Sequence, residues 1–387
     1  MIVGLFCFPE YKIEQWMQIS NGIINWEELN QSKNINGTAD AVMKFTGFNT
    51  GNLVFWVSVL RMIRKNKIFP FSWNTPLKVL KKEKIDVMIF PASNYLNNYF
   101  DISKTNLINL IKELNIPTLI FGLGMQGEFN EINKILPGNI EFVREISKRC
   151  ENVYVRGELT MNVLLKIGIN NVKVLGCPSL LLNPKINLGK IIENKLKNKK
   201  IKKISVHTLS FKKSLQSIEI KLYDDLHSKH IDSEFIFQES PHLVNFINTQ
   251  DKQYLTKLSE YYNSKDKGLV IGKRIKYFTN PLAWCSYLQN NFTHSICTRI
   301  HGTMISLAGE LPTICLYHDK RTFELCKFMK IPCYPATKFI SMDDLQDQIV
   351  FNGKEFDKNR NNIAKEYVNI FNKYNIIVSD DLVNLAL

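Results

Sequence analysis

One span in the last third of the chain limits the possible folds more than any other. Residues 295–298 form a short apolar run that favours a strand, residues 304–308 are typical of a helix, and residues 311–317 form a second apolar run. Gly309 ends the helix between the two runs. A strand, a short helix and another strand in succession build a parallel sheet with crossover helices, so we expect an α/β fold.

Charged and titratable residues follow both of these strands. Ligands of parallel sheets bind outside the carboxyl ends of the strands. The first strand is followed by Arg299 and His301, and the second by His318, Asp319, Lys320 and Arg321. Two neighbouring strands therefore bring cations, an imidazole and a carboxylate to one edge of the sheet, which predicts an anion site.

The charge of the chain also points to anionic partners. The 387 residues include 50 Lys and Arg against 36 Asp and Glu, a net charge of +14, and such a balance suits nucleic acid, an anionic membrane or phosphorylated substrates. No nucleic-acid-binding motif accompanies the lysines, so we expect no nucleic-acid partner. A peripheral contact with the inner membrane is left open by the basic charge.

The cysteines and the apolar segments indicate a cytoplasmic protein. None of the eight cysteines forms a C-x-x-C pair, which favours free thiols in a reducing compartment and predicts no metal site. The apolar stretch Leu53–Leu60 is too short to span a bilayer. The N-terminal residues lack the basic leader and cleavage site of a signal peptide.

The strand and helix patterns divide the chain into two halves. We predict an α/β domain at residues 1–185 and a second at 204–387, whose last helix packs back on the first domain. Seven lysines and one glutamate lie between Lys190 and Lys203, so we predict a flexible, exposed basic linker at 186–203. In the second half the apolar run Gly268–Gly272 is interpreted as a strand. The predicted fold class is two Rossmann-like parallel-sheet domains that face a cleft.

Two motifs in the first half bear on ligands. Gly122-Leu-Gly124-Met-Gln126-Gly127 matches a dinucleotide-binding pattern after a strand, but the residues beyond Gly127 predict no long helix, so we do not expect NAD or FAD. The glycines serve either a sharp turn or a close approach to a ligand. Arg156 ends the strand at 152–156, where its guanidinium suits a carboxylate or phosphate, or equally a salt bridge with Glu158 or a neighbouring acid.

Together these segments resemble the polysaccharide pyruvyltransferase family. The resemblance is carried by Asn49-Thr-Gly-Asn52, Gly122-x-Gly124-x-Gln126, Val155-Arg156-Gly-Glu-Leu-Thr160, Gly176-Cys-Pro-Ser179, Arg299-Ile-His301-Gly302 and Tyr317-His-Asp319-Lys320-Arg321. It implies a two-domain fold similar to that of nucleotide-sugar glycosyltransferases (GT-B-like). It also implies transfer of pyruvate from phosphoenolpyruvate to two hydroxyls of a sugar, giving a cyclic ketal during bacterial surface-polysaccharide assembly, with a free or lipid-linked sugar as acceptor.

The resemblance also suggests roles for single residues. Arg156, His301 and Lys320 match the positions that hold phosphoenolpyruvate. A donor with a carboxylate and a phosphate needs at least two fixed cations, so we add Arg299 and Arg321, with Gly302 beside them. His301 is the predicted acid/base, because an imidazole that titrates near neutrality suits the proton transfers. Phosphoenolpyruvate is a substrate here, and no separate cofactor is expected.

Further residues are candidates for contacts with the acceptor or for shaping the loops. They are Asn49, Asn52, Asn94, Gly124, Gln126, His318 and Asp319. Asn52 departs from the family pattern, in which Asp is common, and Pro91–Asn94 replaces a glycine cluster.

Two other functions remain open from the sequence. One is a nucleotide-sugar-dependent glycosyltransferase of the same architecture, with Glu239 or Glu324 recognising the nucleotide. The other is a non-enzymatic basic protein that binds anionic polysaccharide or nucleic acid.

Overall fold

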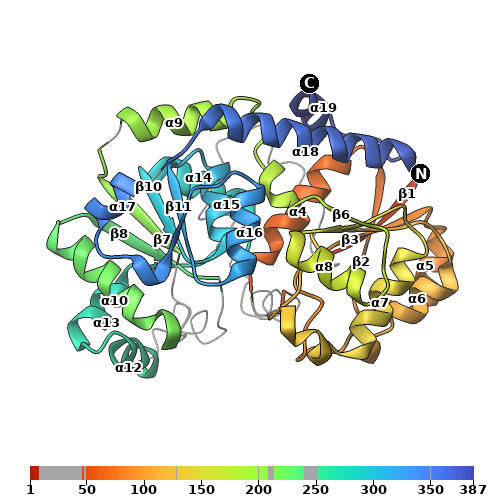
Figure 1. Cartoon of the computed structure of the whole chain (residues 1–387), viewed down its shortest axis with the longest axis horizontal. Coiled ribbons are helices and arrows are strands. Elements are labelled where there is room, and N and C mark those ends of the chain that lie inside the picture. The colour runs from red at the N-terminus through yellow and green to blue at the C-terminus, as the bar shows by residue number, and fades with distance from the viewer. Residues whose placement is uncertain are drawn as a thin grey trace.

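Two parallel sheets form the centres of two lobes that lie side by side (Figure 1). The computed structural model describes residues 1–7, 46–47, 49–127, 129–198, 200–207, 213–238, 252–348 and 350–387. Each strand pair in both sheets is parallel. The predicted fold class, two parallel α/β lobes about a cleft, is confirmed.

The N-terminal lobe is built on a sheet with the order β2-β1-β3-β4, extended by the pair β5-β6 through a bridge between Leu123 and Val155. Its strands are β1 (Ile2–Phe6), β2 (Lys67–Phe71), β3 (Val87–Pro91), β4 (Thr118–Phe121), β5 (Val153–Val155) and β6 (Val172–Val174). Its helices are α4 (Asn52–Ile63), α5 (Leu77–Glu83), α6 (Leu107–Leu114), α7 (Pro137–Ser147) and α8 (Glu158–Lys166). Short 3-10 turns occur at η2 (Ile102–Lys104), η3 (Phe129–Lys134) and η4 (Pro178–Leu181). The order reverses between β1 and β3, which is the crevice where such sheets bind ligands.

The C-terminal lobe has a six-stranded sheet with the order β12-β11-β10-β7-β8-β9. Its strands are β7 (Lys203–His207), β8 (Asp232–Ile236), β9 (Ile275–Lys276), β10 (His294–Cys297), β11 (Thr313–Tyr317) and β12 (Cys333–Pro335). The helices are α9 (Leu188–Asn198), α10 (Lys213–Ser228), α12 (Lys252–Tyr261), α13 (Lys265–Lys273), α14 (Pro281–Asn291), α15 (Ile300–Ala308), α16 (Lys320–Phe328), α17 (Met342–Gln348), α18 (Gly353–Lys373) and α19 (Asp380–Ala386), with a 3-10 turn at η5 (Ala336–Lys338). This order is that of a Rossmann sheet, and its reversal lies between β7 and β10.

Helix α4 joins the lobes into one packed body. Nearly all of its residues are buried, and it packs against η4, α14 and α15. Ser58 on this helix donates a hydrogen bond to the carbonyl oxygen of Pro178 at 2.6 Å. A helix that is apolar on all sides is stable only inside a core. The hydrophobic core is therefore continuous from the first sheet to α14 and α15, and this apolar packing fixes one lobe relative to the other.

The C-terminal helices run across both lobes. In Figure 1, α18 (blue) lies along the top of the molecule, beside α9 and toward the N-terminal lobe. Beyond α18, the backbone N–H of Ser379 donates to the carbonyl oxygen of Met62 at the end of α4, and Asp381 pairs with Arg64.

The segment predicted as a flexible linker is helical instead. Residues 188–198 form α9, with Leu188 and Ile192 buried one turn apart. Asp357 of α18 accepts hydrogen bonds from the backbone N–H groups of Gly189 and Lys190. The many lysines suggested a solvated segment, whereas the helix is specified by apolar residues that recur only once per turn.

The strand predicted at Gly268–Gly272 is wrong, since these residues lie within α13. The Ser264 side chain caps this helix by accepting from the backbone N–H of Lys267. Ile271 is fully buried. A short apolar run does not distinguish a strand from a buried helix segment, and the cap and the packing of α12 against α13 decide the outcome. No helix in the described ranges is long and apolar enough to cross a membrane.

Candidate functional site

A polar cavity of about 320 Å³ lies between the lobes at the carboxyl ends of both sheets. Loops after β3, β4 and β5 line it from one side, and residues after β8, β10 and β11 line it from the other. Its volume is within the range of small-molecule sites. The predicted site residues that line it are Asn49, Asn52, Asn94, Gln126, Arg156, Arg299, His301, His318 and Arg321.

Four predicted residues lie outside this lining. Lys320 is the exposed first residue of α16, and Asp319 caps that helix by accepting from the N–H of Thr322 at 2.7 Å. Gly124 and Gly302 make room for their neighbours. A Cβ atom at Gly124 would lie 2.5 Å from Asn94 Oδ1, and one at Gly302 would lie 2.7 Å from Cβ of His207. A side chain at Gly302 would thus clash with His207, and one at Gly124 would displace the Asn94 amide from its place beside Arg156.

Arg156 is a buried cation whose hydrogen-bond acceptors among the described residues are all neutral. Its side chain is 5% exposed. Nε donates to the carbonyl oxygen of Gly122 at 2.8 Å, and the two terminal nitrogens donate to the Ala92 carbonyl at 3.1 Å and to Asn94 Oδ1 at 3.4 Å. Its guanidinium also lies 5.7 Å from the Phe55 ring centroid. The alternative, a salt bridge with Glu158 or a neighbouring acid, is not formed within the described part of the chain. Burial is the main reason why the pKa of Arg156 is lowered.

The cavity holds an excess of positive charge. Arg156, Arg299 and Arg321 line it, and within the described parts of the chain no Asp or Glu side chain does so. Arg156 is buried without a carboxylate partner among the described residues, and burying such a charge costs several kcal/mol. An anion in this cavity would offset that cost, so the lining favours anionic ligands.

His301 lies on the first turn of α15, where Arg299 is the N-cap residue. Its side chain is 5% exposed, and its ring centroid lies 5.3 Å from that of Phe55. Nε2 has no hydrogen-bond partner among the described residues. Burial, together with Arg156, Arg299 and Arg321, holds the pKa of His301 well below its ordinary value. The imidazole is therefore neutral at pH 7 in the free protein, which corrects the expectation that it titrates near neutrality.

His207, at the end of β7, lies close to the residue that follows His301, since a Cβ atom on Gly302 would lie 2.7 Å from Cβ of His207. Its Nε2 lies 3.3 Å from Ser205 Oγ and 3.4 Å from Ser306 Oγ, and its ring stacks on Trp284 at 5.6 Å. Burial lowers the pKa of His207 to about 3.

The two buried histidines predict acid lability. An unfolded histidine takes up a proton below about pH 6.5, whereas these two stay neutral in the native state, so stability falls as the pH falls below 6.5. We expect a loss of about 1.4 kcal/mol per pH unit for each histidine. Urea denaturation at pH 7, 6 and 5 checks this. His207→Gln should flatten the slope, and an equally steep slope in that variant would contradict the assignment to His207.

A chain of hydrogen bonds crosses the cavity between the lobes. Arg321 donates to Gln126 Oε1, which also accepts from Asn94 Nδ2 at 3.1 Å. Asp319 Oδ2 pairs with Arg321 Nη2 at 2.9 Å. The Arg321 charge and the Thr322 N–H outweigh burial and lower the pKa of Asp319. Asp319 thus orients Arg321 toward the cavity, and Asn94 continues the chain to Arg156.

Several lining residues were not predicted as site residues. Gln238 follows β8, and its carbonyl oxygen accepts from the backbone N–H of Thr50 at 2.8 Å, which ties the two lobes together. Thr298 follows β10, and Tyr99 lies in the loop after β3. The position of Gln238 and Thr298 after parallel strands could have identified them. Tyr99 carries no such signal, because it lies eight residues beyond Pro91, where β3 ends.

Glu324 has a structural role. Its Oε2 accepts from the backbone N–H of Leu159 at 3.0 Å and so caps α8, whose N-cap residue Gly157 has no side chain to do this. Glu324 does not line the cavity, and Glu239 lies outside the described residues. A nucleotide-recognising role for Glu324 therefore finds no support in its position.

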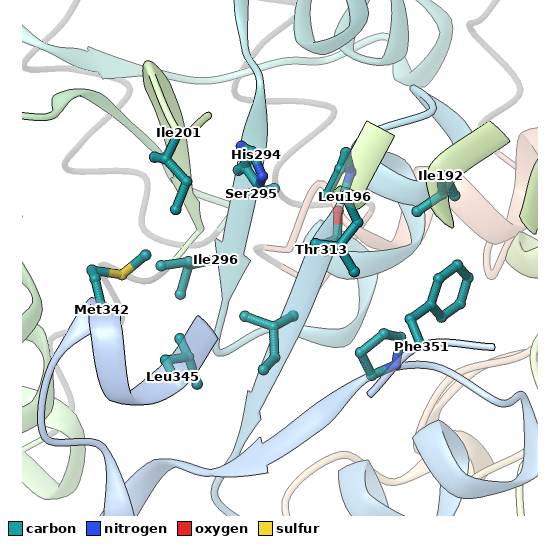
Figure 2. A pocket seen from close by; sticks show the side chains of 13 residues that line it. Ile192, Leu196, Ile201, His294, Ser295, Ile296, Thr313, Met342, Leu345 and Phe351 are labelled. Carbon is teal, nitrogen blue, oxygen red and sulfur yellow. The ribbon is translucent and has the colours of Figure 1, made fainter. Parts of the chain in front are cut away.

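A second cavity, shown in Figure 2, differs from this site in size and chemistry. It measures about 30 Å³ and lies near the amino ends of β10 and β11. Met342 and Leu345 of α17, Ile296 of β10 and Phe351 surround it. This apolar gap is too small for a sugar or phosphoenolpyruvate. Among the residues that the structure describes, no cluster of three or more His, Cys, Asp or Glu could hold a metal ion.

Comparison with known families gives a match over most of the chain. The family model for polysaccharide pyruvyl transferase matches residues 49–320, more than half of the chain. The matched range includes every described residue of the cavity lining except Gly47, Arg321, Thr322 and Leu325. No curated protein gives a significant match.

Three solved structures illustrate the similar chain path. The MnaA–UDP structure from S. aureus is 10% identical, with 95% of this chain and 97% of that chain covered and a TM-score of 0.47. The UDP-N-acetylglucosamine 2-epimerase from Rickettsia bellii is 13% identical, with 96% of each chain covered and a TM-score of 0.47. Anabaena HepE in complex with UDP and glucose is 8% identical, with 96% and 99% covered and a TM-score of 0.46. Identities this low carry no information on ligand or reaction.

Proposed function

The chain belongs to the polysaccharide pyruvyl transferase family, and from this premise we propose that it transfers pyruvate from phosphoenolpyruvate to two hydroxyls of a sugar, forming a cyclic ketal. The observation that carries the proposal is Arg156, a buried guanidinium that, among the residues the structure describes, has no carboxylate partner and faces a cavity lined by no acidic side chain. Phosphoenolpyruvate supplies the two anionic groups that such a cavity favours.

We assign the cations of the cavity to the carboxylate end and the phosphate end of phosphoenolpyruvate. Arg156 comes from the N-terminal lobe, and Arg299 and Arg321 come from the C-terminal lobe. This assignment keeps the donor between the lobes. The exposed Lys320 lies outside the lining, so Arg321 replaces it in our proposal.

His301 can serve all proton transfers in turn. Protonated once the donor has bound, it gives a proton to the methylene carbon of phosphoenolpyruvate and then removes one from the first sugar hydroxyl as that oxygen attacks the adjacent carbon. It next protonates the departing phosphate and removes the proton of the second hydroxyl, which closes the ring. Two hydroxyl protons end on the new methyl group and on phosphate, so the atoms balance. Nε2, which has no partner in the described structure, is the group that we assign to these transfers.

The first test is ligand-induced stabilisation. Phosphoenolpyruvate at about 100 times its dissociation constant should stabilise the native state by about 2.7 kcal/mol, measured as a rise in Tm by differential scanning fluorimetry. Inorganic phosphate is the control and should give a smaller rise, since it lacks the carboxylate. Stabilisation by UDP-sugars in place of phosphoenolpyruvate would contradict the proposal and favour a nucleotide-sugar glycosyltransferase.

A further inference from the structure

Tyr99 is an exposed aromatic residue at the edge of the cavity. It lines the cavity from the loop after β3, and 70% of its surface is exposed. A single exposed aromatic ring is common on protein surfaces and means little by itself. Tyr99 differs from such a residue because the backbone of its loop is held in place by buried side chains.

Two buried asparagines hold the backbone on both sides of Tyr99. Asn97 Oδ1 accepts from the backbone N–H groups of Tyr99 at 3.1 Å and Phe100 at 2.8 Å. Its Nδ2 donates to the carbonyl oxygens of Asn94 and Tyr95. Asn139 donates to the carbonyl oxygens of Asn97 and Phe100. Both asparagine side chains are buried and satisfy their polar groups on the loop backbone, which fixes the loop.

The neighbour of Tyr99 anchors the loop to the lobe. The Phe100 ring packs edge-on against Trp73, with centroids 5.1 Å apart, and Trp73 in turn contacts Phe6 and Tyr95. With Phe100 directed to Trp73, the loop presents Tyr99 at the cavity. A rigid loop that holds an aromatic ring largely in water is typical of a binding surface prepared before its ligand arrives.

The same loop also reaches the donor end of the cavity. Asn94 accepts from Arg156 and donates to Gln126. The loop follows β3 at the strand-order reversal between β1 and β3, where parallel sheets bind ligands. One rigid segment thus sets the distance between the cations and the Tyr99 ring.

We propose that Tyr99 is the acceptor platform, on which the C–H face of a pyranose ring stacks; this rests on the proposed function. A pyranose has an apolar face of C–H groups and an edge of hydroxyls. Stacking on an aromatic ring covers the face at low entropic cost, since Tyr has few rotatable bonds. The hydroxyls then point toward the donor and toward amide side chains of the lining, Asn49 and Asn52.

The experiment compares three variants on defined sugars. Wild type, Tyr99→Ala, Tyr99→Phe and Tyr99→Leu are assayed for phosphate release with phosphoenolpyruvate and a panel of p-nitrophenyl hexopyranosides. Saturation-transfer NMR measures binding of the same glycosides. We expect Tyr99→Ala to raise the acceptor KM about tenfold, as for loss of one stacking contact. The acceptor KM of Tyr99→Phe should stay within about twofold of wild type. That of Tyr99→Leu should lie between the values for Tyr99→Phe and Tyr99→Ala. The Tm rise with phosphoenolpyruvate should be unchanged.

Phe323 provides the matched control. It is a 38% exposed aromatic residue of α16 that packs against Tyr317 in a tilted arrangement and does not line the cavity. Phe323→Ala should leave the acceptor KM unchanged. A wild-type acceptor KM in Tyr99→Ala would overturn the platform while leaving the proposed donor site intact. If wild-type protein showed neither turnover nor saturation transfer with any glycoside, the proposal that a sugar binds at the Tyr99 edge of the cavity would be overturned. Absence of stabilisation by phosphoenolpyruvate in wild type would instead overturn the proposed function itself.

Discussion

Replacing Arg156 with Met is expected to abolish stabilisation by phosphoenolpyruvate and to lower kcat/KM for this donor by about a thousandfold. Truncating one partner of a buried, hydrogen-bonded charge pair costs about 2–5 kcal/mol, and each 1.4 kcal/mol is a factor of ten. Arg156→Lys should recover only part of the loss, because a single ammonium cannot reach the Gly122 and Ala92 carbonyls and a ligand at once. Isothermal titration of phosphoenolpyruvate and steady-state phosphate release measure both effects.

Arg360 offers a matched control for Arg156. It is also fully buried and donates to backbone carbonyls, those of Leu180 and Lys185 among them, but it lies in the core and has Asp357 at 3.7 Å. Arg360→Met should lower the free energy of unfolding and leave the donor affinity of the folded fraction unchanged. If Arg156→Met instead behaved like Arg360→Met, losing stability but retaining donor affinity, Arg156 would be a structural residue and the donor site would lie elsewhere.

Replacing His301 with Ala is expected to lower kcat by at least a hundredfold while phosphoenolpyruvate still stabilises the protein. General acid–base catalysis contributes about 10²–10⁴ in rate, and His301 carries four transfers in the proposed sequence. His301→Gln is the control, because it keeps a polar side chain of similar size that cannot titrate. Single-turnover measurements separate the chemical step from product release. A His301→Ala variant that retained most of its kcat would rule out the acid/base role.

The pH dependence of donor binding follows from the depressed pKa of His301. In the free protein the imidazole is neutral, since burial and three arginines oppose its charge. A donor with negative charge reverses the local potential and raises that pKa, so binding should take up a proton. Consequently kcat/KM for phosphoenolpyruvate should rise as the pH falls through neutrality. Calorimetry in buffers of different ionisation enthalpy measures the uptake directly. Equal uptake in His301→Ala would assign the proton to another group.

Local signals in the sequence were reliable where one residue determines the structure. Asn favours the N-cap of a helix, and the Asn280 side chain accepts from the backbone N–H groups of Leu282 and Ala283 at the start of α14. Signals failed where packing decides. Strand β2 contains Pro70, and a proline would disrupt a central strand. The proline is tolerated here because β2 lies at the edge of its sheet. The position of a strand within its sheet depends on contacts far away in the chain, so no local pattern reveals it.

The sequence by itself determined the parallel α/β architecture, the family, and the residues that follow the strands. Side-chain type and spacing along the chain suffice for these, because every parallel strand delivers its next residues to the same edge. Only the tertiary structure decided which of those residues share a cavity. It placed Arg156 beside His301 and Arg321, left Lys320 at the surface, and turned Glu324 into a helix cap. It also set the protonation state of His301, since a pKa depends on burial and on charges that arrive from both lobes.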